Sequence, residues 1–317
     1  LVGDLNKGMK AMFIMMNGAR LFVGIQGLGL SETAFQSSLY YSKERLQGKL
    51  SSSNNIADPI LVHPEIRKNL LYIKSINEAV RGLTLLTGNC FDLIENSKDK
   101  KEKNTAENFI ALMTPIIKSY ASDKSVENTN RAMQIYGGHG FITDHGMEQL
   151  VRDARITTIY EGTNGVQALD LIGRKLNIDN GLLFNQFIEL IDNYINKINQ
   201  NDKMSKYLNL YLPSYKKFKD ILNFIKSLKD EKEINSHAVE FLNLSSLIAL
   251  GYVWLKFIEI SLDKLEKSED DFYNSKIETG NFFLTKLLTE IQMLNDNIKS
   301  GGKYYNDYKD HYFETAI

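Results

Sequence analysis

The sequence contains very little cysteine and proline. Its 317 residues include one cysteine, Cys90, and four prolines. A single cysteine excludes an intramolecular disulfide framework and any zinc or iron–sulfur site built from cysteines of one chain. It suits a reducing compartment, so we expect a cytoplasmic protein. The scarcity of proline leaves long stretches without a helix breaker, and the sequence therefore predicts a mostly helical protein.

An excess of charge of one sign and long apolar runs are also lacking. Lys and Arg total 38 against 39 Asp and Glu, which favours neither nucleic acid nor an anionic membrane surface as a partner. The most apolar window, residues 242–260, is interrupted by polar and charged side chains, so we expect no membrane span. The five histidines show no HExxH-like spacing, and no metal site is predicted. The chain begins at Leu1 with no basic and apolar leader, which suggests a fragment or a processed chain.

Helical periodicity divides the chain into two parts. In the first part it predicts long helices, whose short connections indicate an antiparallel four-helix bundle, over residues 17–47, 64–96, 105–122 and 123–136. Asp123 is the expected N-cap of the last helix, and Gly137-Gly138 its stop. After about residue 180 the chain is rich in Lys, Asn, Ile and Leu, and a second helical domain is expected with amphipathic windows at 182–198, 215–228, 238–265 and 274–298.

Glycine is concentrated in the first expected helix, at positions 24, 27 and 29. Each glycine in a helix interior costs about 1 kcal/mol relative to alanine. The cluster therefore indicates a place where another backbone or a ligand approaches closely.

Three short segments contain residues suited to binding or catalysis. The first is Gln134-Ile-Tyr-Gly-Gly-His-Gly140, whose glycines can leave backbone N–H groups free to face phosphate oxygens. It follows a helix, so it is not the strand–turn–helix fingerprint of a Rossmann fold, and a simple helix stop explains it better on spacing alone. The second is Ser42-Lys-Glu-Arg-Leu-Gln-Gly48, where Arg45 can bind a phosphate or merely interact with the helix dipole.

The third segment runs from Val151 to Asn164 and contains Glu161 between Ile159-Tyr160 and Gly162. A carboxylate in partly apolar surroundings has a raised pKa and can act as a general base near neutral pH. Gly162 would allow close approach of a substrate, and Thr163 can cap the helix that follows. The alternative is a glutamate near a helix start that is stabilised by the helix dipole.

Taken together and in order, these pieces resemble the C-terminal half of an acyl-CoA dehydrogenase. The resemblance covers residues 1–176 and rests on Leu1-Val-Gly-Asp4, Asn17-Gly-Ala-Arg20, Glu44-Arg45, Gln134 to Gly138, Arg152-Asp153 and Tyr160-Glu-Gly-Thr163. Residues 180–317 look like the extra helical domain of a longer bacterial subgroup, which includes enzymes acting on long-chain and methylthio-propanoyl thioesters. The implied fold class is all-α. The implied domains are the end of a middle β-domain and linker at 1–16, the family's helical bundle at 17–178, and the extra domain at 179–317.

The resemblance also implies roles for individual residues. Glu161 matches the catalytic base, which removes the α-proton of the acyl thioester while a hydride passes from the β-carbon to flavin N5. Ala19 occupies the place where some members carry the base instead, which supports Glu161. The implied substrate-side residues are Asn17, Arg20 and Gly162. The implied FAD-binding residues are Arg45, Gln47, Gln134, Gly137, Gly138, Thr163 and Asn164, of which Arg45 and Gln47 usually act across a subunit boundary.

The implied activity belongs to fatty-acid β-oxidation and has an electron-transferring flavoprotein as partner. The implied assembly is a homodimer or tetramer. The family's N-terminal helical domain and its middle β-domain are not in this sequence, so we expect activity only with that missing half, in cis or in trans. Two alternatives stay open: a helical assembly module that has lost catalysis, and an acyl-CoA oxidase that passes electrons to O₂.

Overall fold

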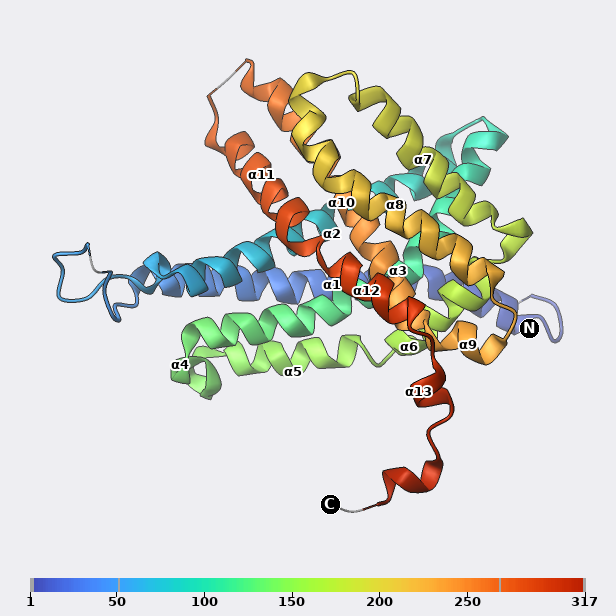
Figure 1. Ribbon diagram of the computed structural model, residues 1–317, viewed down its shortest axis with the longest axis horizontal. Coiled ribbons are helices and arrows are strands. Elements are labelled where there is room, and N and C mark those ends of the chain that lie inside the picture. Colours follow the sequence, from blue (N-terminus) through green and yellow to red (C-terminus); the bar gives the residue numbers. More distant parts are fainter. Residues whose placement is uncertain (1–2, 51, 268, 316–317) are drawn as a thin grey trace.

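Four helices form the bundle on which the candidate site is built. The computed structural model describes residues 3–50, 52–267 and 269–315. Within it α1 (Gly8–Glu44), α2 (Pro64–Asn96), α3 (Lys100–Tyr136) and α5 (Met147–Thr157) pack against one another. Figure 1 shows α1 and α2 running along the long axis of the molecule. The predicted all-α fold with a four-helix bundle is therefore confirmed.

The boundaries of the first two helices were largely predicted from the sequence. α2 has the predicted bounds, because Pro64 occupies its first turn, where the missing N–H costs nothing. α1 begins nine residues earlier than predicted, at Gly8, and ends at Glu44 rather than residue 47. Of the segment 1–16, expected as the end of a middle β-domain and a linker, Leu1 and Val2 lie outside the described residues, and residues 8–16 belong to α1.

The prediction of separate helices at 105–122 and 123–136 was wrong. α3 is one continuous helix that contains both Pro115 and Asp123. Asp123 does not cap a helix: its Oδ1 accepts a hydrogen bond from Asn164 Nδ2 at 2.7 Å. Asp99 is the real N-cap, since its carboxylate accepts from the backbone N–H of Lys101 at 2.8 Å. The fourth member of the bundle is instead α5.

Close contact between α1 and α3 depends on two of the glycines noted in the sequence. A Cβ at Gly24 would lie 2.7 Å from Ile117 Cγ2, and one at Gly27 would lie 3.0 Å from the carbonyl oxygen of Ala121. The expected close approach of another backbone is therefore confirmed at these two positions. Gly29 differs, because a Cβ there would meet nothing within 4 Å.

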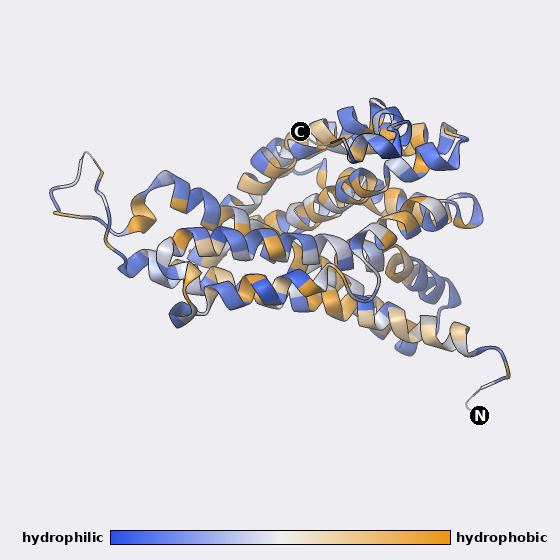
Figure 2. Ribbon diagram, turned by 90° about the horizontal axis from the view of Figure 1, so that it is seen from below, coloured by the Kyte–Doolittle hydropathy of each residue, from blue (hydrophilic) through white to orange (hydrophobic). Residues whose placement is uncertain are grey.

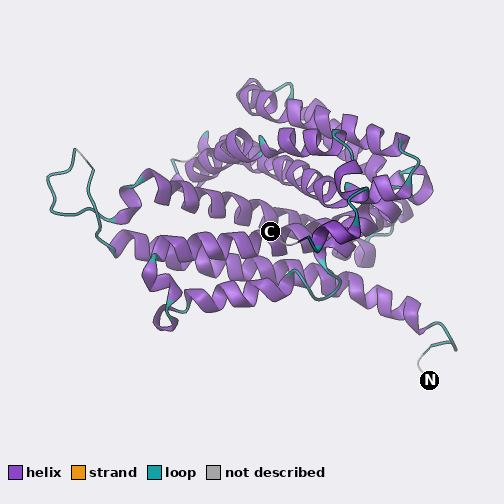
Figure 3. Cartoon of the chain, turned by 60° about the horizontal axis from the view of Figure 1, so that its bottom comes forward, coloured by secondary structure: helices purple, strands orange, loops and turns teal. Residues whose placement is uncertain are grey.

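The second part of the chain is also helical (Figure 3). α7 (Leu182–Ile198) and α10 (Ala238–Leu265) have the predicted bounds. α8 (Ser205–Ser227) starts ten residues before its predicted window. The predicted window 274–298 consists of α11 (Asp271–Phe282), a π-helical stretch at Phe283–Leu287 and α12 (Glu290–Lys299). The remaining short helices are α4 (Gly138–Phe141), α6 (Asn164–Leu169), α9 (Glu231–Ser236) and α13 (Lys303–Asn306).

α10 joins the two parts through one hydrophobic core. Trp254 is fully buried, and its indole Nε1 donates a hydrogen bond to the carbonyl oxygen of Ser75 in α2 at 3.1 Å. Apolar side chains from both parts belong to the same buried cluster, and Figure 2 shows apolar residues concentrated where the helices face one another. The division into domains at residues 178 and 179 stays a prediction, because the core does not separate there.

α10 also has a property that the sequence did not reveal. By length and composition it is apolar enough to cross a membrane, but 83% of its apolar window is buried inside the fold. A helix that is apolar on all sides and covered by other helices is the ordinary central helix of a large core.

Replacing Gly27 with alanine should destabilise the bundle, since the new methyl group would collide with the α3 backbone, which cannot move aside cheaply. Overpacking of this kind costs about 1–3 kcal/mol. The matched control is Gly29→Ala, which should stabilise the protein by up to about 1 kcal/mol because only helix propensity changes. Urea unfolding followed by circular dichroism measures both. Equal effects of the two substitutions would contradict close packing at Gly27.

Candidate functional site

The residues singled out in the sequence fall into two groups at opposite ends of α1. Arg20 lies in the first half of α1 beside the turn that contains Glu161, and Asn17 lies one turn earlier on the same helix. Arg45 is at the other end of α1. At 1.5 Å rise per residue the two arginines lie about 37 Å apart. We name the two groups by their central residues. The Glu161 turn comprises residues 158–164, and the Arg45 cavity is lined by residues 41, 45, 47–48, 60, 63, 65–66 and 134–139.

The Glu161 turn has an unusual backbone. Glu161 has φ of 58° and Gly162 has φ of 85°, so two consecutive residues adopt positive φ. Glycine adopts this conformation freely, whereas for a glutamate it costs about 1–2 kcal/mol. Strain of this size persists where neighbouring groups fix the backbone, and such positions are concentrated at functional sites.

Three side chains bond to the carbonyl oxygens of this turn. Arg20 Nε and Gln167 Nε2 both donate to the Glu161 carbonyl oxygen, at 3.2 Å and 3.4 Å. Lys118 Nζ, from the middle of α3, donates to the Gly162 carbonyl oxygen at 2.8 Å. The turn is therefore bonded to α1, to α3 and to the helix that follows it.

Lys118 is the most buried charged group near the turn, with no exposed side-chain surface. Besides the Gly162 carbonyl it bonds Asn164 Oδ1 at 2.7 Å. Burial lowers the pKa of Lys118 to about 8; the charges of Asp123 and Glu161 oppose this, and that of Arg20 adds to it. Burial likewise raises the pKa of Asp123.

Asn164 connects Lys118 to the rest of α3. Its amide nitrogen donates to Asp123 Oδ1 at 2.7 Å and to Ser122 Oγ at 2.9 Å. Its neighbour Thr163 has a structural role as well: it caps α6, since its Oγ1 accepts from the backbone N–H of Val166 at 3.3 Å. The predicted cap is confirmed, and Asn164 is engaged within the fold.

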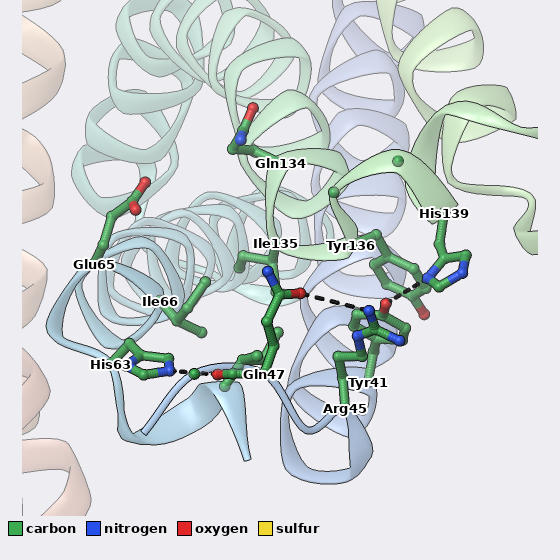
Figure 4. A pocket seen from close by; sticks show the side chains of 14 residues that line it. Tyr41, Arg45, Gln47, His63, Glu65, Ile66, Gln134, Ile135, Tyr136 and His139 are labelled. Atoms are coloured by element: carbon green, nitrogen blue, oxygen red, sulfur yellow. Dashed lines mark hydrogen bonds between the residues drawn. The ribbon is translucent and has the colours of Figure 1, made fainter. Parts of the chain in front are cut away.

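The Arg45 cavity has a volume of about 670 Å³ and contains five of the seven predicted FAD-binding residues (Figure 4). These are Arg45, Gln47, Gln134, Gly137 and Gly138. The other two, Thr163 and Asn164, belong to the Glu161 turn. The predicted FAD-binding residues thus lie in two separate places of one chain.

The walls of the cavity hold both cationic and neutral donors. Arg45 donates to Gln47 Oε1 at 3.5 Å, a long bond that leaves most of the guanidinium free. His63 Nε2 lies 2.8 Å from the Gln47 carbonyl oxygen, and this hydrogen bond holds the loop after α1 in place. In Figure 4 the Gln134 amide points away from Arg45 and Gln47, although Gln134 lines the same cavity.

Gly137 provides exposed backbone on the opposite wall. It ends α3 with φ of 60°, which confirms the predicted helix stop. A Cβ at Gly137 or Gly138 would meet nothing within 4 Å, so the backbone here is open to the cavity. Beside it the rings of Tyr41 and Tyr136 stack at 4.1 Å, and Tyr41 Oη lies 2.8 Å from His139 Nδ1.

Several residues of both groups were not found from the sequence. Lys118 and Gln167 bond the Glu161 turn, and Tyr41, His63 and His139 line the Arg45 cavity. Lys118 had a signal: it is a lone charge in the buried stretch Met113–Ala121, and a buried charge requires partners. The aromatic and histidine residues had none, because they come together only through tertiary packing.

Comparison with known families assigns both parts of the chain. A model described as the acyl-CoA dehydrogenase C-terminal domain matches residues 6–176, more than half of the chain. The chain belongs to the acyl-CoA dehydrogenase family. A second model, described as acetyl-CoA dehydrogenase C-terminal like, matches residues 187–308. The resemblance inferred from the ordered motifs is thereby confirmed.

Curated relatives of this acyl-CoA dehydrogenase family member are longer than the chain itself. A 3-methylmercaptopropionyl-CoA dehydrogenase of Ruegeria pomeroyi is 31% identical over 95% of this chain and 52% of that protein. A butyryl-CoA dehydrogenase of Syntrophomonas wolfei is 28% identical over 92% of this chain and 49% of that protein. The chain therefore spans about half the length of the curated relatives it matches.

Solved structures of the family share the fold. An acyl-CoA dehydrogenase from Bacillus anthracis complexed with FAD has a TM-score of 0.74 at 19% identity, over 93% of this chain and 50% of that chain. ACDH-11 from Caenorhabditis elegans, in complex with C11-CoA, has a TM-score of 0.72 at 21% identity, over 89% of this chain and 44% of that chain. Both alignments extend across the two helical parts, so the complete helical arrangement is a family fold.

The lowered pKa of Lys118 predicts that the stability of the fold depends on pH. The ordinary value of this pKa is 10.5 and its value in the fold is about 8, so between these pH values the unfolded state binds more protons than the folded state. The free energy of unfolding contributed by this group therefore rises with pH across that window. Lys118→Met should remove the rise. Urea unfolding at several pH values between about 7.5 and 10 measures it.

The control for this experiment is Lys101→Met, on the same helix but at an exposed position. It should keep the pH dependence of the unchanged protein. If the Lys118→Met variant showed the same pH dependence as well, the lowered pKa of Lys118 would be wrong.

Proposed function

We propose that this chain provides the C-terminal part of an FAD-dependent acyl-CoA dehydrogenase in which Glu161 is the base. The observation that carries the proposal is the backbone of Glu161, a carboxylate residue in a strained conformation whose carbonyl is bonded by Arg20 and Gln167. The names of the relatives support an acyl-CoA thioester as substrate. Because those relatives differ in their acyl groups, we propose the class of substrate and no particular acyl chain.

Glu161 would accept a proton from the α-carbon of the thioester. Glu161 is partly exposed, and apolar residues close to it in the sequence are exposed as well: Ile159 is 47% and Val166 is 50% exposed. Once covered by substrate and protein these side chains would exclude water from the carboxylate, which favours proton transfer in a low-dielectric site. Asn17, Arg20 and Gly162 would lie on the substrate side of the turn.

The Arg45 cavity suits the pyrophosphate of FAD. A pyrophosphate needs a cation and several N–H donors, and the cavity offers the Arg45 guanidinium, the Gln47 amide and the open backbone at Gly137 and Gly138. When bound, FAD supplies the chemistry that side chains lack, acceptance of a hydride from the β-carbon. The residues of the cavity would hold and orient it.

The separation between the two groups supports assembly from several copies. Arg20, which bonds the Glu161 carbonyl, lies about 37 Å along α1 from Arg45, farther than one dinucleotide would reach. We therefore infer that the Arg45 cavity of one copy serves the FAD whose flavin lies near Glu161 of another, in a homodimer or tetramer. The matched relatives are about twice as long as this chain, so turnover would need the rest of the family architecture, in cis or in trans. An electron-transferring flavoprotein would reoxidise the enzyme.

Glu161→Gln should abolish turnover while leaving flavin bound. Loss of a general base lowers the rate by about 10²- to 10⁴-fold, and the amide keeps the size of the side chain. The assay follows acyl-CoA oxidation by the chain together with the rest of the family architecture, while the visible spectrum reports bound flavin. Glu107→Gln, at an exposed position on α3, is the control and should keep full activity. Near-normal turnover of Glu161→Gln would eliminate the assignment.

Arg45→Gln should weaken FAD binding by about tenfold or more, because a hydrogen bond to a charged group contributes roughly 1.5–3 kcal/mol. Flavin content after gel filtration, from the visible spectrum, measures the loss. Lys43→Gln removes a charge from the same last turn of α1 and should change little. Equal losses in the two variants would mean that Arg45 acts only through general charge.

A further inference from the structure

The Glu161 turn is a conformation that the chain does not adopt without external support. Two successive positive φ values, one of them at a glutamate, are disfavoured in an isolated peptide. The helix that follows, α6, is only six residues long, and its one side-chain bond to the Glu161 carbonyl comes from Gln167. The other side-chain bonds to the Glu161 and Gly162 carbonyls come from two cations, Arg20 on α1 and Lys118 on α3.

Of these two cations, Lys118 has the larger desolvation cost. Its side chain is fully buried, and within residues 3–50, 52–267 and 269–315 it makes no ion pair with a carboxylate. Its partners are neutral oxygens, the Gly162 carbonyl and Asn164 Oδ1, and the carboxylate of Asp123 reaches it only through Asn164. An apolar side chain would fill the same space at a lower cost in desolvation, so the cation is not explained by stability alone.

We propose that Lys118 is a positioning residue, which holds the Gly162 carbonyl and Asn164 against α3 and thereby fixes the backbone of Glu161 and the direction of its carboxylate. This inference rests on the proposed function of Glu161 as the base. Positioning matters because a displacement of about 1 Å at a reacting group can lower a rate by about 10²-fold. Lys118 does not itself touch the substrate.

A second lysine on α3, partly buried, provides a comparison. Lys124 is 15% exposed and donates to Tyr72 Oη and to Glu127 Oε2, both at 2.8 Å. It therefore joins α2 to α3 and makes no hydrogen bond to the Glu161 turn in the described part of the chain. Loss of either lysine removes a cation from the same helix, but only loss of Lys118 should release the turn.

The experiment compares Lys118→Met with Lys124→Met by hydrogen exchange of the chain and by steady-state kinetics of the assembled enzyme. Amides of residues 158–166 should exchange about tenfold faster or more in Lys118→Met and stay unchanged in Lys124→Met. The kcat of Lys118→Met should fall by about 10- to 100-fold with KM within about threefold. In the Glu161→Gln background, Lys118→Met should cause no further loss of kcat.

Lys118→Gln keeps an N–H donor group without the charge and should recover part of both effects, and it also serves if the methionine variant folds poorly. Unchanged exchange in the turn, or an equal loss of kcat in Lys124→Met, would overturn the proposal. An active Glu161→Gln enzyme would reject Glu161 as the base, whereas the exchange measurement would still decide whether Lys118 holds the turn.

Discussion

The close contact between α1 and α3 is the constraint on which both candidate groups depend. Gly24 and Gly27 let the backbone of α1 approach Ile117 and Ala121 on α3. At one end of the pair this brings Arg20 and Lys118 to the same turn. At the other end the C-terminus of α1 and the C-terminus of α3 meet to form the Arg45 cavity. A single helix–helix contact therefore fixes the geometry of two distant places.

Much of the fold could be predicted from the sequence because its helices are long and periodic. α2, α7 and α10 have the predicted bounds, since turn residues and changes in periodicity mark their ends. α3 was divided in error because Asp123 was taken as the N-cap of a new helix, a position that aspartate commonly occupies. The fold overrides this signal: much of the central stretch of α3 is buried, and Asn164 provides the partner that the Asp123 carboxylate needs. Local patterns carry no information about such a distant partner.

The candidate site was predictable residue by residue but not as an arrangement. Short motifs identified Glu161, Arg20, Arg45 and Gly137, because each has a local pattern. The predicted helix at 17–47 already separated Arg20 from Arg45, but the sequence did not show that Arg20 bonds the Glu161 carbonyl. It also did not single out Lys118, whose importance appears only when α3 is placed beneath the Glu161 turn.

The second helical part has a physical role in this arrangement. α10 packs against α2, α3 and α6, so α3 lies between α1 and α10 and has little freedom to shift. Trp254 bonds the Ser75 carbonyl in α2, and Lys276 on α11 pairs with Glu78 of α2 at 2.9 Å. Because α3 carries Lys118 and α6 carries Gln167, the helices that α10 supports are the ones that bond the Glu161 turn. The second helical part thus supports the Glu161 turn through α3 and α6. The apolar core of this part is continuous with the core of the bundle.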